Sequence, residues 1–202
     1  MIELTPEKSA LLLVDLQNDF LHPKGAYGRA GQSSRQISSL PKKIAPLADA
    51  MRDAGGWVVS THFTLIPGRS GEPLISAHLK MLRPFLGRGD FAPGSWGHDL
   101  VDALKPADFR IEKVAYSAFF MTRLEWVLRK AGIDTLLITG IVTNGGVAST
   151  LRDAHVRDFH TILLTDGCGA FSRKVHNAAT ADLATISETA TCEDAAVALG
   201  VK

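Results

Sequence analysis

Two ionisable residues stand where apolar runs of the sequence end, and together they can transfer a proton. Asp15 directly follows "SALLLV", and Lys113 ends the segment "FRIEK". If both runs are buried strands, burial raises the pKa of the Asp15 carboxyl unless a nearby cation compensates, and the Lys113 ammonium is a candidate for that cation. Such a pair can serve as acid and base near neutral pH, but structural ion pairs have the same composition. Position alone leaves both interpretations open.

A second candidate site lies in the stretch "ITGIVTNGGVASTLRDAH", residues 138–155. It predicts a buried strand, a tight turn and a helix, an arrangement at which many α/β enzymes place a nucleophile. The turn contains Thr143, Asn144 and two glycines, the second of them Gly146, and no thiol. A turn without a nucleophilic side chain leaves open which chemistry, if any, this site performs.

The rest of the chain alternates short apolar runs with helical patterns. Strands are predicted at 9–15, 57–63, 109–114, 135–142, 160–166 and 184–190. Segments with apolar residues at three- and four-residue spacing lie between most of these runs. This alternation predicts a parallel sheet covered by helices on both faces.

Ligands of such sheets bind beyond the carboxyl ends of the strands, so the polar residues there are candidate substrate contacts. Gln17 follows the first strand, His62 ends the second and Asn144 follows the fourth. A structural role in a turn is the competing interpretation for each of them, and His62 is expected either to line the pocket as a hydrogen-bonding group or to support that turn.

One long connection, residues 63–108, departs from the alternation, is rich in Gly and Pro, and predicts a single short helix near residues 98–104. A loop of this length in a compact domain is usually functional or disordered, and its aromatic residues favour an ordered lid or a subunit contact. Phe20 and Trp96 are predicted to close the pocket. Phe119, in "AYSAFF", either stacks on a planar substrate or belongs to the core.

Composition narrows the class of protein. The 202 residues, 46% of them hydrophobic, predict one domain over 1–202 with the 63–108 segment as its lid. Lys and Arg number 22 against 21 Asp and Glu, which argues against nucleic acid and membrane surfaces as partners. No apolar run reaches the ~20 residues of a membrane span, and the first residues do not resemble a signal peptide. Two cysteines indicate a reducing, cytoplasmic location.

Several motifs in order give the chain a family resemblance. "LLLVDLQNDF", "PGSWGHDLVDALKP" and the stretch from "IEKVAYSAFF" to "ILLTDGCGAF" resemble the isochorismatase-like, or cysteine hydrolase, superfamily over about residues 8–190. The resemblance implies a three-layer α/β/α fold with a doubly wound, parallel, six-stranded sheet of order 3-2-1-4-5-6. It also implies a small-molecule substrate and a homo-oligomer, dimer or tetramer.

Carried over residue by residue, the resemblance makes Asp15 and Lys113 catalytic and places the family's nucleophilic cysteine at Gly146. It implies a cis peptide bond before Thr143, between Val142 and Thr143, with the backbone of Val142, Thr143 and Gly146 stabilising an oxyanion. Gly146 has no side chain, so the covalent amidase mechanism is absent at that position.

Three interpretations remain open. In the first, Asp15 and Lys113 hydrate a vinyl ether by acid–base chemistry, as isochorismatases do, although those enzymes differ in the "VTNGG" stretch. In the second, water replaces the thiol and attacks an amide or ureide. In the third, catalysis is lost and the pocket only binds a small molecule or partner. Cys168 is a further, weakly supported nucleophile, since buried thiols are usually inert. His62 and the distant His78 are too few for a metal site, so neither a metal nor another cofactor is expected.

Overall fold

The computed structural model describes residues 2–200, and its centre is one parallel sheet of six strands in the order β3-β2-β1-β4-β5-β6. Every neighbouring pair is parallel. The strands are β1 (Ser9–Val14), β2 (Trp57–Phe63), β3 (Phe109–Lys113), β4 (Thr135–Ile141), β5 (His160–Gly169) and β6 (Glu188–Ala190). The predicted sheet order is confirmed.

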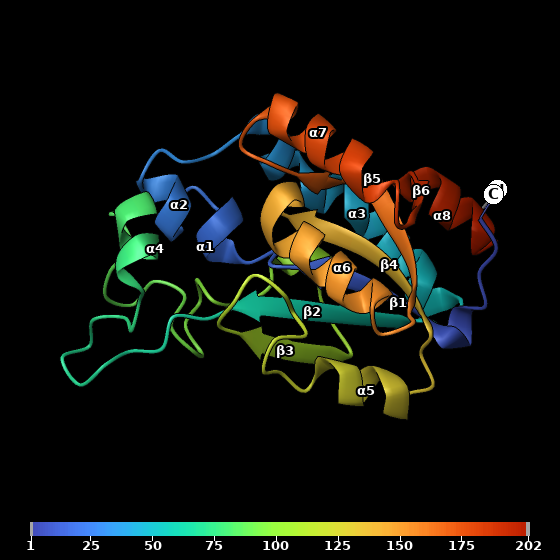
Figure 1. Cartoon of the computed structure of the whole chain (residues 1–202), viewed down its shortest axis with the longest axis horizontal. Helices are drawn as coiled ribbons and strands as arrows, with labels where there is room; N and C mark the ends of the chain where they lie inside the picture. The colour runs from blue at the N-terminus through green and yellow to red at the C-terminus, as the bar shows by residue number, and fades with distance from the viewer. Residues whose placement is uncertain (1, 201–202) are drawn as a thin grey trace.

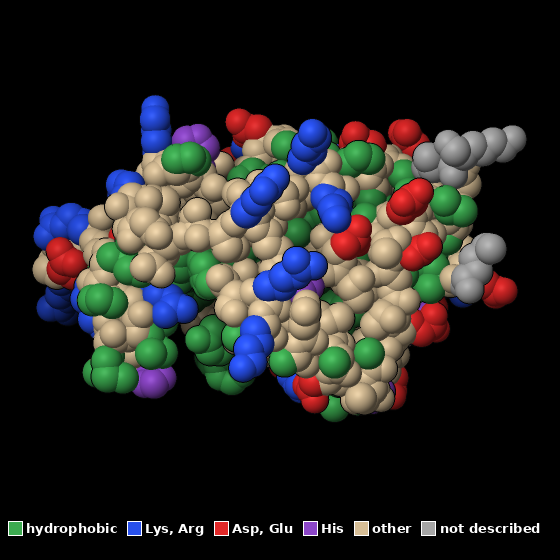
Figure 2. All heavy atoms as spheres, turned by 90° about the horizontal axis from the view of Figure 1, so that it is seen from above, with side chains coloured by type: hydrophobic (Ala, Val, Ile, Leu, Met, Phe, Trp, Pro, Cys, Tyr) green, Lys and Arg blue, Asp and Glu red, His purple; other side chains and the backbone are tan. Residues whose placement is uncertain are grey.

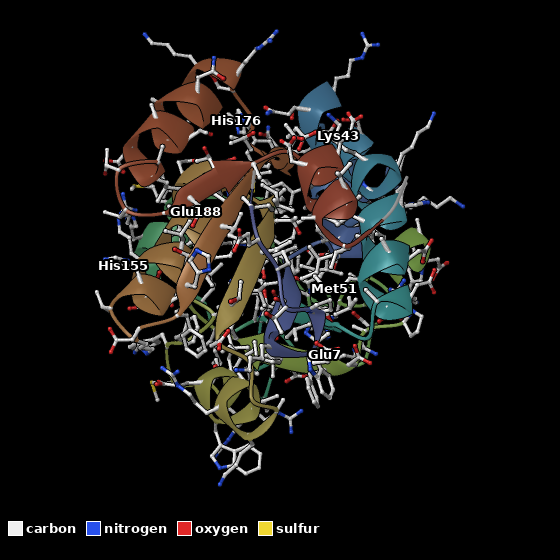
Figure 3. The ribbon with its side chains drawn as sticks, turned by 90° about the vertical axis from the view of Figure 1, so that its right-hand side faces the viewer. Glu7, Lys43, Met51, His155, His176 and Glu188 are labelled. Carbon is white, nitrogen blue, oxygen red and sulfur yellow. The ribbon has the colours of Figure 1, made fainter. Side chains whose placement is uncertain are left out.

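Helices cover both faces of the sheet, as Figures 1 and 3 show from two directions. They are α1 (Asn18–Leu21), α2 (Ala26–Arg29), α3 (Arg35–Asp53), α4 (Ala77–Leu82), α5 (Leu124–Lys130), α6 (Ala148–His155), α7 (Arg173–Leu183) and α8 (Cys192–Ala198). Short turns of 3-10 helix lie at Pro6–Lys8 and Asp102–Leu104. Helices α3 and α8 pack on one face and α5, α6 and the end of α7 on the other, which confirms the three-layer α/β/α prediction.

The central strand explains why this fold forms. All six residues of β1 are buried, and its side chains alternate between the two cores: Leu12 faces the α5/α6 side, and Leu11 and Leu13 face α3. A strand that is apolar on both sides is stable only between two helical layers. On α3, Met51 is fully buried against the sheet. The ends of β1 and β4 consequently lie deep in the molecule.

A third, smaller hydrophobic cluster joins the long connection to the body of the protein. Its buried members include Tyr27, Leu86 and Phe91, and Phe20 and Phe171 pack against it. The rings of Tyr27 and Phe171 stack with centroids 5.5 Å apart. The segment between β2 and β3 is therefore tied to the strand ends by aromatic contacts.

Three predicted boundaries were wrong. The expected helix near residues 98–104 is only the 3-10 turn Asp102–Leu104, and the long connection instead contains α4, which Ser76 caps by accepting a hydrogen bond from the Leu79 amide. The last strand is only Glu188–Ala190. Strand β5 continues to Gly169 because a bulge shifts its register against β4.

Candidate active site

Asp15 lies at the carboxyl end of β1 in a conformation that few non-glycine residues adopt. Its φ is 56°, in the left-handed region, which costs about 1 kcal/mol or more and is tolerated best by Asn and Asp. The chain can turn there because Gly140 of β4, with φ 119°, lies against Val14; a Cβ at residue 140 would be 2.1 Å from the Val14 carbonyl oxygen. The turn directs the carboxyl group of Asp15 into a cavity.

The Asp15 carboxylate is buried and paired. Lys113 Nζ lies 2.7 Å from Oδ2, and the Thr61 hydroxyl donates a 3.0 Å hydrogen bond to Oδ1. Asp15 and Lys113 keep only 6% and 1% of their side-chain surface exposed. Burial raises the pKa of Asp15 above its usual range, and Lys113 and Thr61 partly oppose that rise. The sheet therefore brings together the two residues predicted to act together.

Lys113 reaches Asp15 across β2, which separates their strands. Its ammonium lies 5.7 Å from the centre of the Phe63 ring and donates a 3.0 Å hydrogen bond to the Ala115 carbonyl oxygen. A carboxylate, a carbonyl oxygen and an aromatic face therefore surround the buried Lys113 ammonium.

The turn after β4 forms the opposite wall. A π-helical turn, Thr143–Val147, leads into α6. The non-proline cis peptide bond is Ile141–Val142, one residue earlier than the predicted Val142–Thr143 bond. The Thr143 hydroxyl does not face the cavity but lies 2.8 Å from His176 Nδ1 of α7. Burial and the nearby Arg173 lower the pKa of His176.

Gly146 lies directly beside the acid–base pair. A Cβ atom placed on Gly146 would be 3.2 Å from Asp15 Oδ2, 2.9 Å from the Ile141 carbonyl oxygen and 3.3 Å from Val14 Cγ1. The side chain that Gly146 lacks would therefore project from the turn past the Asp15 carboxylate.

These groups open onto a cavity of 290 Å³ between the strand ends and α4. Figure 2 shows hydrophobic side chains gathered at the end of the molecule where α4 lies. Of the predicted site residues, the cavity is lined by Asp15, Phe20, Lys113, Val142 and Gly146. Asn144 is exposed and does not line it.

Gln17 and His62 were predicted as substrate contacts, but the structure places both in a buried network behind the cavity. The Gln17 amide bonds the backbone of Phe63 and the His98 carbonyl oxygen. Both ring nitrogens of His62 have partners 2.8 Å away, the Ser60 hydroxyl and the His98 carbonyl oxygen. Burial lowers the pKa of His62 to about 4, so it is neutral at pH 7. Neither residue lines the cavity.

Trp96 and Phe119 also lie outside the cavity. Trp96 is 52% exposed and packs edge-on against His22, with ring centroids 4.9 Å apart. Phe119 belongs to the core on the α5/α6 face, 5.7 Å from the Phe159 ring. The core interpretation of Phe119 holds, and Trp96 does not close the pocket.

Sequence reasoning missed part of the cavity wall. Tyr27, Phe63 and Phe171 line it. From sequence, Arg83 is either a solvated loop arginine or a residue that binds a substrate carboxylate, as are Arg69 and Arg88, and the structure places Arg83 in the wall. Ser76 marks the start of α4 but gives no signal that the connection folds back over the strand ends.

The polar residues along β5 do not belong to this site. Asp166 caps α8 by accepting a hydrogen bond from the Cys192 amide and pairs with Lys43 of α3, which Figure 3 labels. Cys168 and Cys192 are free and buried. Burial raises the pKa of both thiols, that of Cys192 to about 12. Cys168 does not line the cavity, so it is not placed to replace the missing nucleophile.

Residues 2–200 contain neither a cluster of metal ligands nor a membrane-spanning helix. No group of three His, Cys, Asp or Glu side chains there is arranged to hold a metal ion. No helix in that range is long and apolar enough to cross a membrane.

Comparison with known proteins places this site in a family. The isochorismatase domain model matches residues 9–196. Ureidoacrylate amidohydrolase RutB of Methylobacterium radiotolerans is 35% identical over 96% of this chain and 81% of its own length. The RutB protein of Acinetobacter baylyi is 35% identical over 83% of this chain and 73% of its own.

Solved structures agree. An isochorismatase family protein from Burkholderia thailandensis superposes with a TM-score of 0.76 at 26% identity, covering 98% of each chain. A cysteine hydrolase from Pseudomonas syringae pv. phaseolicola superposes with a TM-score of 0.83 over 99% of this chain and 96% of its own; at 23% identity this likeness shows the fold alone. The chain belongs to the isochorismatase family and is a hydrolase of that family.

Proposed function

We propose that this protein hydrolyses a terminal amide or ureide by direct attack of water, with Asp15 as general base and without a covalent acyl-enzyme. The observation that carries the proposal is the missing side chain of Gly146 on the cavity wall, at a position whose Cβ would lie 3.2 Å from Asp15 Oδ2. A water molecule in the cavity, further out along the direction of that missing side chain, comes within hydrogen-bonding reach of the base.

The reaction uses groups already described. Asp15 takes a proton from water as the oxygen–carbon bond forms at the substrate carbonyl. The amides of Val142 and Gly146, on the cavity wall, receive the developing negative charge, a role typically worth about 3 kcal/mol for each donor. The proton then passes from Asp15 to the leaving nitrogen as the carbon–nitrogen bond breaks.

The raised pKa of Asp15 suits this role. A carboxylate of ordinary pKa is a weak base at neutral pH, and catalysis improves as the pKa of the base approaches the working pH. Lys113, 2.7 Å away, keeps the buried carboxyl ionisable by opposing the cost of burial. The amide or ureide is favoured over a vinyl ether because the RutB relatives are named as ureidoacrylate amidohydrolases.

The test is a hydrolysis screen of small amides and terminal ureides with the parent protein and three variants. Asp15→Asn should lower kcat at least 100-fold. Asp166→Asn removes a carboxylate outside the cavity and should leave turnover unchanged. Gly146→Cys restores a thiol at the nucleophile position. Silence in the parent protein with activity in Gly146→Cys would refute the proposal and identify a scaffold that only binds its ligand.

We also infer that the chain acts as one domain, with residues 63–108 as its lid, in a cytoplasmic homo-oligomer, dimer or tetramer. The aromatic cluster around Tyr27 supports the lid, and two free cysteines support a reducing compartment. Exposed apolar side chains support an interface: Tyr116, which lines the cavity, is 61% exposed, and Met121 is 84% exposed. Light scattering after gel filtration checks the assembly, and a monomer at micromolar concentration contradicts it.

A further inference from the structure

We propose that Arg83 is a specificity-determining residue that binds a carboxylate of the substrate, so that the protein prefers anionic amides or ureides. This inference rests on the proposed function, because it assigns the end of the substrate remote from Asp15. It is carried by the contacts of the Arg83 guanidinium and by the charges that line the cavity.

Arg83 follows α4 and lines the cavity. Its Nε donates a 3.1 Å hydrogen bond to the Tyr27 hydroxyl, and one terminal nitrogen donates a 2.8 Å bond to the Leu82 carbonyl oxygen. Its other terminal nitrogen makes no hydrogen bond to any residue within 2–200. Tyr27 is itself buried and stacked on Phe171, so the hydroxyl that accepts the hydrogen bond from Arg83 has a fixed position.

Arg83 combines a place on the cavity wall with the lack of a carboxylate partner among the described residues. Arg29 pairs with Asp90 and Arg88 pairs with Glu72, whereas Arg69 is exposed and lies outside the cavity. No carboxylate of residues 2–200 lies within 4 Å of Arg83. The guanidinium of Arg83 therefore has a terminal nitrogen on the cavity wall that can donate hydrogen bonds to a substrate carboxylate, whose planar geometry it matches.

The charge of the cavity points the same way. Asp15 and Lys113 neutralise each other, which leaves Arg83 as the uncompensated permanent charge of the wall. The rest of the wall is largely aromatic and aliphatic, and includes Phe20, Phe63 and Leu86. The cavity therefore fits a small monoanion whose amide or ureide carbonyl lies at Gly146 and whose carboxylate lies at Arg83 across an apolar spacer.

The experiment compares 3-ureidopropionate with its uncharged counterpart propylurea, in the parent protein, Arg83→Gln and Arg83→Lys. The parent protein should prefer the anion. Arg83→Gln should lower kcat/KM for the anion about 10- to 100-fold, mainly through KM, and leave propylurea unchanged. Arg83→Lys keeps the positive charge but loses the paired N–H donors of the guanidinium, so its kcat/KM for the anion should lie between those of the parent protein and Arg83→Gln. Arg88→Gln, on an arginine outside the cavity, is the matched control and should change neither substrate.

A binding measurement separates this inference from the proposed function. Calorimetry with 4-oxopentanoate, which has a carboxylate and a carbonyl but no leaving nitrogen, should show binding that Arg83→Gln abolishes and Arg88→Gln preserves. Arg83-dependent binding without any turnover would uphold the subsite and refute the hydrolase. Turnover with equal use of both ureas, equal rates in Arg83→Gln, or no binding of 4-oxopentanoate to the parent protein would overturn the subsite.

Discussion

Replacing Lys113 by Met should destabilise the protein strongly at neutral pH and much less in acid. Met fills much of the same volume but removes the ammonium 2.7 Å from Asp15 Oδ2. At an effective dielectric constant near 20, that contact is worth about 6 kcal/mol of attraction. Removing the ammonium also removes its own cost of burial, so the net loss should be about 3–5 kcal/mol, the usual range for breaking one partner of a buried pair.

The pH dependence follows from the direction of the Asp15 pKa. Because that pKa is raised in the folded state, protonation of Asp15 favours folding. This contribution is complete below the unfolded value of 3.8 and is lost as pH rises through the folded pKa. Without Lys113 the folded pKa rises further, so the deficit of the variant should grow with pH by up to about 1.4 kcal/mol per unit.

Urea unfolding of the parent protein and of Lys113→Met between pH 5 and pH 8 measures this deficit. The double variant Asp15→Asn/Lys113→Met, which has no buried charge at either position, is the control and should show no such growth. A deficit in Lys113→Met that is the same at every pH would refute the argument, because the cost would then come from packing rather than from an uncompensated carboxylate.

Two further predictions concern residues around the pair. Gly97→Ala should destabilise the protein by about 2 kcal/mol or more, because the added Cβ would be 2.2 Å from Asp19 Oδ2. Gly87→Ala is the control and should change stability little, because no atom lies within 4 Å of its added Cβ. Equal unfolding midpoints of the two variants would contradict this prediction. Thr61→Val removes a hydrogen bond that lowers the pKa of Asp15, so the pKa of Asp15 should rise in this variant. The acid limb of the plot of kcat/KM against pH should then move to higher pH by about one unit. An unmoved limb would mean that Asp15 is not the titrating base.

The fold was predictable because its signals are local. After Ser9, the strand "SALLLV" is apolar at every position, as expected for a strand covered on both faces. The alternation of such strands with helices then predicts a parallel sheet. The same logic placed Asp15 and Lys113 at one edge of the sheet. Their 2.7 Å contact is the direct result of that shared edge.

The parts that the sequence did not predict depend on contacts between distant segments. Gln17 and His62 stand at strand ends as Asp15 does, but the 96–101 segment folds over them and engages their polar atoms. Arg83 lies in a connection with weak periodicity, and its place in the cavity wall depends on Tyr27, more than 50 residues earlier. No short-range sequence pattern distinguishes a polar residue that is engaged behind the cavity, such as His62, from one that lines the cavity, such as Arg83.

The most direct test of the water mechanism is the intact mass of the protein, quenched during steady hydrolysis of its best ureide. The account predicts turnover by the parent protein that Asp15→Asn abolishes, with no added mass on the protein at any time. Gly146→Cys, sampled in parallel, provides a thiol on which an acyl or carbamoyl adduct can form. An adduct on the turning-over parent protein, at Cys168 or any other residue, would contradict direct attack by water.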